Sequence, residues 1–341
     1  MALGLWRQKQ NKVMTNQIDH LLIENFKSIK RCELSCCKRI NLFIGNTNSG
    51  KSNALEALSL FSLPFLKENT SKKISTFIRI ENAGELFYNG NWEQPITIKT
   101  NIGTSTISND RDEGLTVEIE THNGNGKYRI DDRLNFRFGR NKEYLPVIRK
   151  YTFPSETGIK KAHSRYLIPP FGLNLPDVIE RNAALKKEIS DLLAEYKLSL
   201  VFDKANQSLK LMRPHKNGKN IFLMPYHSIG ETLQRIIFYK AAMASNQDAV
   251  LLFEEAEADA FPTCIPHITQ EMIHKKDNQY FVATHSPHIL NDLWENGQDE
   301  LAVFIFKYRR GQTEIRQLSE NELREVNQNG MDLFSTSESY V

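Results

Sequence analysis

The stretch INLFIGNTNSGKSNALEAL, residues 40–58, carries the most informative pattern in this chain. It begins with an apolar run at 40–44, which predicts a short buried strand. After a loop of small and polar residues, the apolar residues within 54–58 fall on one side of a helix. The order strand, loop and helix is therefore expected here, and the chemistry of the loop indicates what the chain binds.

The loop fits the pattern G-x-x-x-x-G-K-[ST], with Gly45, Gly50, Lys51 and Ser52 at the required positions. A loop of small residues at a helix N-terminus directs backbone N–H groups and the positive end of the helix dipole at one point, which suits phosphate. Lys51 supplies a mobile charge for the β- and γ-phosphates, and the Ser52 hydroxyl suits Mg²⁺. A chance match in a Gly/Asn/Ser turn is the alternative, but the flanking strand and helix favour a nucleoside triphosphate site.

The composition is that of a globular protein with a large core. Of the 341 residues 40% are hydrophobic, which fits one large or two modest domains. The net charge of +3 permits contact with nucleic acid without arguing for it. Since no apolar run reaches the length of a membrane span and residues 1–13 lack the features of a secretory signal, no membrane contact is expected. The use of four cysteines agrees with a reducing cytosol, so a cytoplasmic protein is predicted.

The first half of the chain is expected to be antiparallel β-structure around the phosphate loop. Alternating apolar residues predict strands at 18–26, 95–106 and 115–121, the last with a hairpin into 128–130. A helix is predicted over 52–66, where Pro64 ends it.

The second half is expected to begin with a helical arm and to end in a parallel sheet. An apolar face over 176–197 predicts one amphipathic helix, and 198–213 predicts two strands around Asn206. Strand and helix then alternate, which indicates a parallel sheet, with helices at 228–243, 264–275 and 288–294 and strands at 249–253, 279–283 and 301–308. The predicted segments are an extension at 1–17, with Met14 as an alternative start, an N-terminal lobe at 18–150, an arm and hairpin at 151–225, and a C-terminal lobe at 226–341.

Basic and aromatic residues alternate irregularly between 127 and 165. Such a mixture can follow a nucleic-acid backbone and stack bases. It also arises when the aromatic rings pack inward and the charges stay in water, which is the interpretation we prefer.

The segment AVLLFEE, residues 249–255, predicts a buried strand that ends in two carboxylates. A phosphate loop needs an acidic element that holds the metal and orients a water molecule. Glu254 can hold Mg²⁺ at the strand end, and Glu255 is placed to act as general base. Capping of the next helix is the alternative, which the phosphate loop in the same chain disfavours.

The segment QYFVATHSP, residues 279–287, predicts a further strand with His285 just beyond its end. A histidine beside such a site can contact the γ-phosphate or the attacking water and sense whether the terminal phosphate is present. In isolation it would be interpreted as a structural histidine, and its place after the acidic strand reverses that preference.

The segment YHSIGETLQR, residues 226–235, opens another helix. Ser228, Gly230 and Glu231 place a hydroxyl, an exposed N–H and a carboxylate at its N-terminus, which is again an anion site. One nucleotide hardly needs two such helix ends in one chain. We therefore expect this motif to close over the nucleotide that a second copy of the chain binds.

Taken together, GNTNSGKS, HSIGETLQR, VLLFEEAEADAFP and ATHSP resemble the ABC-type ATPase head shared by the SMC, RecF and OLD families. The strongest resemblance is to compact OLD-like AAA-type ATPases of bacterial DNA repair and antiphage defence. The opening IENFKSIKRCEL, residues 23–34, is similar to that group's first strands, and the resemblance covers about residues 18–335. It implies an α/β P-loop NTPase fold with an antiparallel N-terminal lobe, a parallel-sheet C-terminal lobe and a short helical arm.

The resemblance also implies roles for particular residues. Ser228, Gly230 and Glu231 would meet the γ-phosphate of the opposing subunit, Glu254 and Ser52 the metal, Glu255 would be the base and His285 the switch. Ala256, Asp259 and Phe261 depart from the group's usual proline and histidines, and Gln94 is a candidate for its lid glutamine. The nucleotide would be lined by Gly45, Asn46, Asn48, Gly50, Lys51, Ser52 and Asn53.

The implied activity is slow hydrolysis of ATP by a homodimer that sandwiches two ATP·Mg²⁺. Two functional classes remain open. The ATP cycle drives engagement of DNA in repair or recombination, or the protein gates or scaffolds a separate nuclease or toxin effector in antiphage defence. We favour the second, because residues 288–341 show no clustered acidic triad of the kind that a nuclease in the same chain would need. An ABC transporter ATPase fits the opening strand and the long gap between the motifs poorly.

Overall fold

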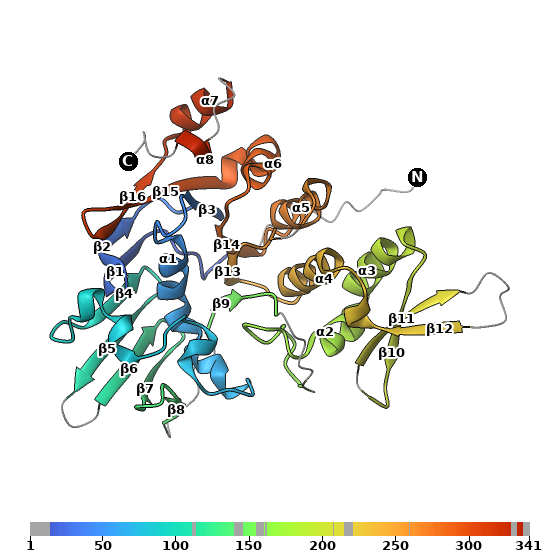
Figure 1. The fold of residues 1–341 in the computed structure, drawn as a ribbon, viewed down its shortest axis with the longest axis horizontal. Helices are drawn as coiled ribbons and strands as arrows, with labels where there is room; N and C mark the ends of the chain where they lie inside the picture. Colours follow the sequence, from blue (N-terminus) through green and yellow to red (C-terminus); the bar gives the residue numbers. More distant parts are fainter. Residues whose placement is uncertain are drawn as a thin grey trace, which may run out of the picture.

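The central feature of the computed structural model is a six-stranded sheet with the strand order β16-β15-β3-β14-β13-β9 (Figure 1). Strand β3 comes from the first 50 residues of the chain, whereas β13, β14, β15 and β16 come from its last third. All neighbouring strands in this sheet are parallel except β15 and β16. The phosphate-loop strand β3 therefore lies between two C-terminal strands. The bounds are β3 (Ile40–Gly45), β9 (Ile148–Tyr151), β13 (Ala249–Glu254), β14 (Asn278–Ala283), β15 (Leu301–Arg309) and β16 (Gln312–Gln317).

The structure describes residues 14–110, 114–139, 146–154, 160, 162–206, 208–214, 221–258, 260–328 and 333–336. Most of the predicted N-terminal extension and Asp259 lie outside these residues. Residues 14–17 of the predicted extension are described, and the backbone N–H groups of Thr15 and Asn16 donate to Oδ1 of Asp248 at 2.8 and 3.1 Å. The predicted segment boundaries stay predictions.

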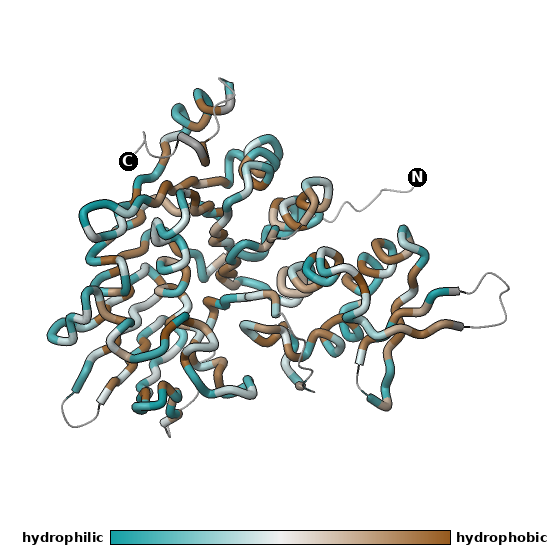
Figure 2. Tube along the Cα trace, viewed as in Figure 1, coloured by the Kyte–Doolittle hydropathy of each residue, from teal (hydrophilic) through white to brown (hydrophobic). Residues whose placement is uncertain are grey.

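Two hydrophobic cores cover the two faces of this sheet. Successive residues of a strand point to opposite faces. Phe43 accordingly joins the core shared with the antiparallel sheet, while Leu42 and Ile44 join the core under the helices. This burial on both sides explains why β3 and its neighbours are almost continuously apolar, and Figure 2 shows apolar residues concentrated along the central strands.

A seven-stranded antiparallel sheet forms the N-terminal lobe, in the order β2-β1-β4-β5-β6-β7-β8. The predicted strand at 95–106 is wrong as a single element, because Thr100 pairs with Gly103 and the chain turns at 101–102. Oγ1 of Thr100 accepts the N–H groups of Ile102 and Gly103 and so stabilises the turn. The predicted hairpin into 128–130 is confirmed. The bounds are β1 (Leu21–Phe26), β2 (Ile29–Leu34), β4 (Ile96–Thr100), β5 (Gly103–Asp110), β6 (Gly114–Thr121), β7 (Gly124–Ile130) and β8 (Phe136–Arg137).

Helix α1 (Lys51–Leu58) follows the phosphate loop and packs between the two sheets. The predicted helix over 52–66 is wrong in its second half. The chain tightens into the 3₁₀ helix η1 (Ser59–Lys67), which contains Pro64. Proline lacks the N–H that an α-helix interior requires.

The arm differs most from the prediction. The single helix over 176–197 is wrong, because Asn182 has extended dihedral angles and separates α2 (Leu175–Arg181) from α3 (Ala183–Glu195). The two strands around Asn206 are confirmed as β10 (Ser199–Asp203) and β11 (Ser208–Pro214), and β12 (Ile221–Pro225) adds a third. This small sheet projects from the end of the molecule beside α3 (Figure 1).

The predicted alternation in the last third is confirmed, with helices α4 (Glu231–Ala244), α5 (Pro266–His274) and α6 (Pro287–Gly297) over one face of the parallel sheet. Helices α7 (Glu320–Gln328) and α8 (Leu333–Thr336) follow β16. No helix in the described part of the chain has the length and apolar character needed to cross a bilayer. Short 3₁₀ helices are η2 (Ile74–Thr76), η3 (Ala83–Leu86), η4 (Tyr88–Gly90), η5 (Tyr226–Ser228), η6 (Pro262–Cys264) and η7 (Gln298–Glu300).

The basic and aromatic stretch packs largely inward where it is described, as we preferred. The rings of Tyr128 and Phe136 lie 4.7 Å apart, and Phe136 is buried. Arg149 is buried on β9, with its guanidinium carbon 4.2 Å from the centre of the Tyr166 ring. Arg137 forms an ion pair with Asp131 at 2.5 Å. Several of these charges therefore have partners within the fold.

Candidate active site

The phosphate-loop pattern forms a turn in which two glycines approach neighbouring strands closely. Gly45 has φ +143°, and a Cβ there would lie 2.2 Å from the carbonyl oxygen of Phe306 on β15. Gly50 has φ +103°, and a Cβ there would lie 2.1 Å from Oγ1 of Thr313 on β16. A larger residue at either position would displace the loop. Asn48, with φ 60°, adopts the left-handed conformation that asparagine tolerates.

The buried side chain of Lys51 folds back across this loop. Its Nζ donates to the carbonyl oxygens of Gly45 and Asn46 at 2.8 and 2.9 Å, and to Oγ of Ser49 at 3.3 Å. Burial lowers the pKa of Lys51 to about 8, and two nearby carboxylates oppose that shift. A buried ammonium group beside a helix N-terminus is complementary to an anion. The loop therefore fits the phosphate chain of a nucleotide.

Ser52 and Glu254, far apart in the sequence, meet beside the loop. The Ser52 hydroxyl donates to the Glu254 carboxylate, which also accepts from Arg79 at 2.9 Å and lies 3.3 Å from Nζ of Lys150. Although burial raises the pKa of Glu254, the charges of Lys150 and Arg79 and the Ser52 hydrogen bond hold it below its usual value. An ionised carboxylate next to a hydroxyl fits a hard cation such as Mg²⁺.

The cations around Glu254 belong to a network that the sequence did not predict. Nε of Arg79 donates to Oε1 of the fully buried Glu56 at 2.7 Å, and Nζ of Lys27 donates to Oε2 of Glu56 at 2.5 Å. Glu56 thus fixes Arg79 from α1, while Lys150 reaches Glu254 from the neighbouring strand β9. No local pattern marks these residues, because their partners are distant in the sequence.

Glu255 and His285 lie together just beyond the ends of β13 and β14. Nε2 of His285 is 3.6 Å from Oε1 of Glu255, and both side chains are partly exposed. Glu255 has φ 46°, and its N–H donates to the carbonyl oxygen of Ala283 at 2.9 Å, which fixes the turn to the neighbouring strand. Burial and then the charge of Lys51 lower the pKa of His285, while Glu255 raises it. The imidazole therefore favours its neutral form.

The predicted serine motif does not reach this site within one chain. Helix α4 begins beside the small sheet, away from α1 and the phosphate loop (Figure 1). Oγ of Ser228 donates to the carbonyl oxygen of Pro225 at 2.6 Å, and Glu231 pairs with Arg235 at 2.6 Å. A Cβ at Gly230 would meet nothing within 4 Å. The motif therefore presents an open surface.

Residues 17–220 of the chain match the family described as AAA ATPase domain. The chain belongs to this family. The match identifies an ATPase.

Two further comparisons place this AAA ATPase domain among known proteins. The chain is similar to an SMC head crystallised with the C-winged helix domain of ScpA, with 14% sequence identity, a TM-score of 0.51, and coverage of 90% of this chain and 99% of that one. At that identity the likeness shows the fold alone, which is that of an ABC-type head. The DNA replication and repair protein RecF of Lactobacillus acidophilus is 37% identical over 46 residues, which make up 14% of this chain and 12% of RecF.

Asn53 and Gln94, the two remaining predicted residues, make contacts within the fold of this ATPase domain. Nδ2 of Asn53 donates to Oγ of Ser28 at 2.7 Å, so its side chain joins α1 to the β1–β2 turn. Gln94 is exposed, and its carbonyl oxygen accepts from Asn25 at 2.7 Å. Its assignment as a lid glutamine stays a prediction.

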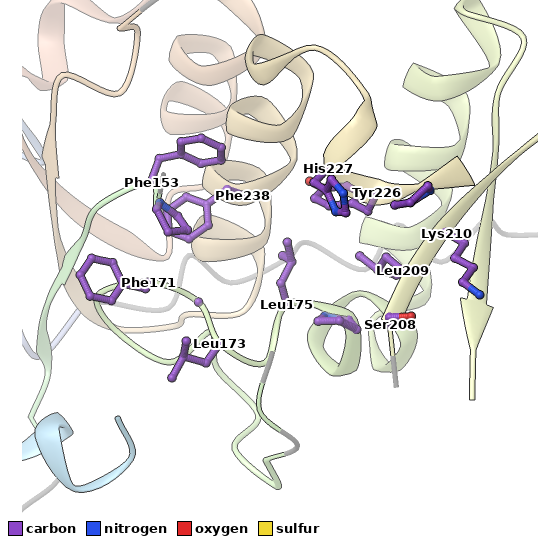
Figure 3. Close-up of a pocket in the computed structure, with 14 residues that line it drawn as sticks. Phe153, Phe171, Leu173, Leu175, Ser208, Leu209, Lys210, Tyr226, His227 and Phe238 are labelled. Atoms are coloured by element: carbon purple, nitrogen blue, oxygen red, sulfur yellow. The ribbon is translucent and has the colours of Figure 1, made fainter. Parts of the chain in front are cut away.

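A cavity of about 280 Å³ lies next to the serine motif (Figure 3), and no residue of the phosphate loop lines it. Tyr226 and His227 line one side of it, and Phe153 and Phe238 line another. The cavity connects the start of α4 to the arm, so it belongs to the surroundings of the serine motif.

Proposed function

We propose that this AAA ATPase domain binds ATP with Mg²⁺ at residues 45–52 and hydrolyses the nucleotide in a homodimer. One observation carries the proposal: the ends of the parallel strands β3, β14 and β13 bring Lys51, His285 and Glu255 to one place. A cation can bind phosphate, and a carboxylate and a histidine can act on the attacking water, which are roles that hydrolysis of a phosphoanhydride uses.

The roles of the residues follow from their positions. The loop N–H groups and Lys51 would bind the phosphates, which requires Nζ of Lys51 to turn from the loop carbonyls toward the ligand. Ser52 and Glu254 would hold Mg²⁺, which supplies positive charge to the phosphate oxygens when bound. Glu255, exposed and at the strand end, would accept a proton from the attacking water, and His285 would orient that water.

Each site would be completed by a second copy of the chain. Ser228 and Gly230 lie at an open helix N-terminus, which favours an anion. A two-fold axis that places this end of α4 over the partner's phosphate loop creates two equivalent composite sites. Turnover would be slow, because each cycle requires the two chains to associate.

The direct test is phosphate release from ATP by the purified chain, with and without Mg²⁺. Lys51→Ala is the matched control, since it removes the phosphate-binding charge. Mg²⁺-dependent release that Lys51→Ala abolishes supports the proposal. Release that is equal in wild type and Lys51→Ala would come from a contaminant and would remove the support.

We further propose that the cycle gates a separate nuclease or toxin in antiphage defence, in the cytoplasm. A head of the same fold has been crystallised with a domain of a partner protein. The β12 strand exposes Phe222 and Leu223, which suits protein contact. Affinity purification from the native host tests this. A co-purified nuclease or toxin that is released or activated upon ATP hydrolysis would support the proposal, and a co-purified partner that hydrolysis leaves unchanged would contradict it.

A DNA-binding role in repair or recombination is the second candidate, and the local similarity to RecF favours it. Binding to phosphates releases counterions, so DNA affinity should fall steeply as salt rises. Affinity that does not change with salt, or no affinity in the ATP-bound state, would exclude direct DNA binding as the function.

A further inference from the structure

A third carboxylate, Glu257, lies buried beside the candidate base and histidine. After β13 ends at Glu254, a turn closed by the Ala258 N–H and the Glu255 carbonyl oxygen, at 3.0 Å, carries Glu257 back toward the strand ends. Its residue exposure is 8%. The Glu257 side chain is thus enclosed, although it lies two residues from Glu255, the exposed candidate base.

The Glu257 carboxyl joins this turn to the turn that carries His285. Its Oε1 accepts hydrogen bonds from the Thr284 hydroxyl and, at 3.3 Å, from the backbone N–H of His285. Oγ1 of Thr284 in turn accepts the N–H of Ser286 at 2.9 Å. One side chain therefore satisfies the polar groups at the start of the histidine turn.

The second oxygen of Glu257 explains why this arrangement is costly. Oε2 is buried and has no hydrogen-bond partner among the described residues. Burial raises the pKa of Glu257, and the negative charge of Glu255 adds to that effect. A buried polar atom without a partner lowers the free energy of unfolding. An apolar side chain would avoid this cost but would leave the Thr284 hydroxyl and the His285 N–H without their acceptor.

We infer that Glu257 is a positioning residue of the hydrolytic site, whose buried carboxyl holds the backbone of His285 so that the imidazole faces Glu255. This role rests on the proposed function, since it acts through His285 and Glu255. Glu257 itself contacts the turn, and nothing in the role requires it to touch the nucleotide.

Paired variants separate this role from simple stability. Glu257→Gln keeps an oxygen acceptor, and Glu257→Ala removes it. Thr284→Val removes the matching hydroxyl, and Thr284→Ser keeps it. We expect Glu257→Ala and Thr284→Val to lower kcat for ATP by about tenfold to a hundredfold with KM nearly unchanged, as misplacement of a reacting group does. The Gln and Ser variants should stay within about threefold of wild type, and the Ala/Val double variant should be no worse than the more damaging single one.

A second readout does not depend on hydrolysis. A proton–carbon NMR spectrum of histidine-labelled protein, with the His285 signal assigned from a His285→Ala sample, reports the surroundings of the imidazole. We expect Glu257→Ala to move that signal and Glu257→Gln to leave it in place. The proposed function and the positioning role can therefore fail separately. A wild-type chain without ATPase activity would refute the proposed function, and the His285 signal would still decide whether Glu257 positions the imidazole.

Two results would overturn the inference. One is a Glu257→Ala chain, measured well below its melting temperature, with wild-type kcat and an unmoved His285 signal. The other is a Glu257→Gln chain as impaired as Glu257→Ala, which would show that the charge rather than the acceptor geometry matters.

Discussion

Nε2 of His285 lies 3.6 Å from Oε1 of Glu255. The contact follows from the sheet, because the parallel register pairs Glu254 with Ala283 and so brings Glu255, one residue beyond β13, and His285, two residues beyond β14, to the same edge. Lys51 lies near this pair, because its charge lowers the pKa of His285 and the charge of Glu255 raises the pKa of Lys51. The candidate hydrolytic groups of one chain therefore lie together, whereas the serine motif lies elsewhere.

Replacing Glu255 by Gln tests its role as base. The amide keeps the size of the side chain but does not accept a proton, so hydrolysis should slow by about 10²-fold or more while ATP binding persists. Single-turnover hydrolysis and an equilibrium binding assay measure the two effects. Glu195→Gln, at an exposed position at the end of α3, is the control and should behave as wild type. Normal hydrolysis by Glu255→Gln would remove Glu255 as the base.

Asn182 should contribute to stability as the cap of α3. Its side chain accepts the N–H of Leu185 at 3.1 Å, and its loss should cost about 1 kcal/mol. Asn182→Ala is therefore expected to lower the melting temperature by about 2 °C. The exposed Lys187→Ala change on the same helix serves as control. Equal melting temperatures for the two variants would show that the break between α2 and α3 does not depend on this cap.

The cysteines should differ in reactivity. Cys36 is exposed, whereas Cys32 and Cys37 are buried, and burial raises the pKa of both thiols to about 12. At pH 8 we expect iodoacetamide to modify Cys36 quickly and Cys32 and Cys37 only after unfolding. Peptide mass spectrometry measures this, and rapid labelling of Cys32 in the folded chain would contradict the packing of β2.

The same thiols give stability a definite dependence on pH. Their folded pKa lies above the unfolded value of 9.0, so the folded state retains protons that the unfolded state loses. Their contribution to the free energy of unfolding is fully present below about pH 9 and is lost as the pH rises toward 12. Replacing both by Ser should flatten this part of the stability curve measured by urea unfolding. A curve of unchanged slope would show that these thiols do not titrate between the two states.

The sequence predicted the parts of the site that carry a local pattern. The phosphate loop, the acidic strand and the histidine strand each combine a short apolar run with polar residues at its end, and each element lies where it was expected. The parallel sheet followed from the alternation of strands and helices in the last third.

Other parts depend on partners that are distant in the sequence. Strand β9 contains Arg149 and Lys150, which do not suggest a buried strand until Tyr166 and Glu254 supply their contacts. The helical periodicity of the arm continues across Asn182, so it did not reveal the break. The sequence did not point to Arg79 either, because Glu56 and Glu254 become its neighbours only in the fold.

In the proposed dimer two chains share each site, and mixing two inactive variants tests this sharing. Lys51→Ala removes the positive charge that would bind phosphate, and Ser228→Arg blocks the serine motif that would contact the partner's nucleotide. In a mixed dimer both defects fall in one site and the other site is intact. Equal mixing should therefore restore about a quarter of the wild-type ATPase rate, since half of the dimers are mixed and each has one intact site of two. Activity that stays at the level of the separate variants, although mixed dimers form, would contradict the composite site.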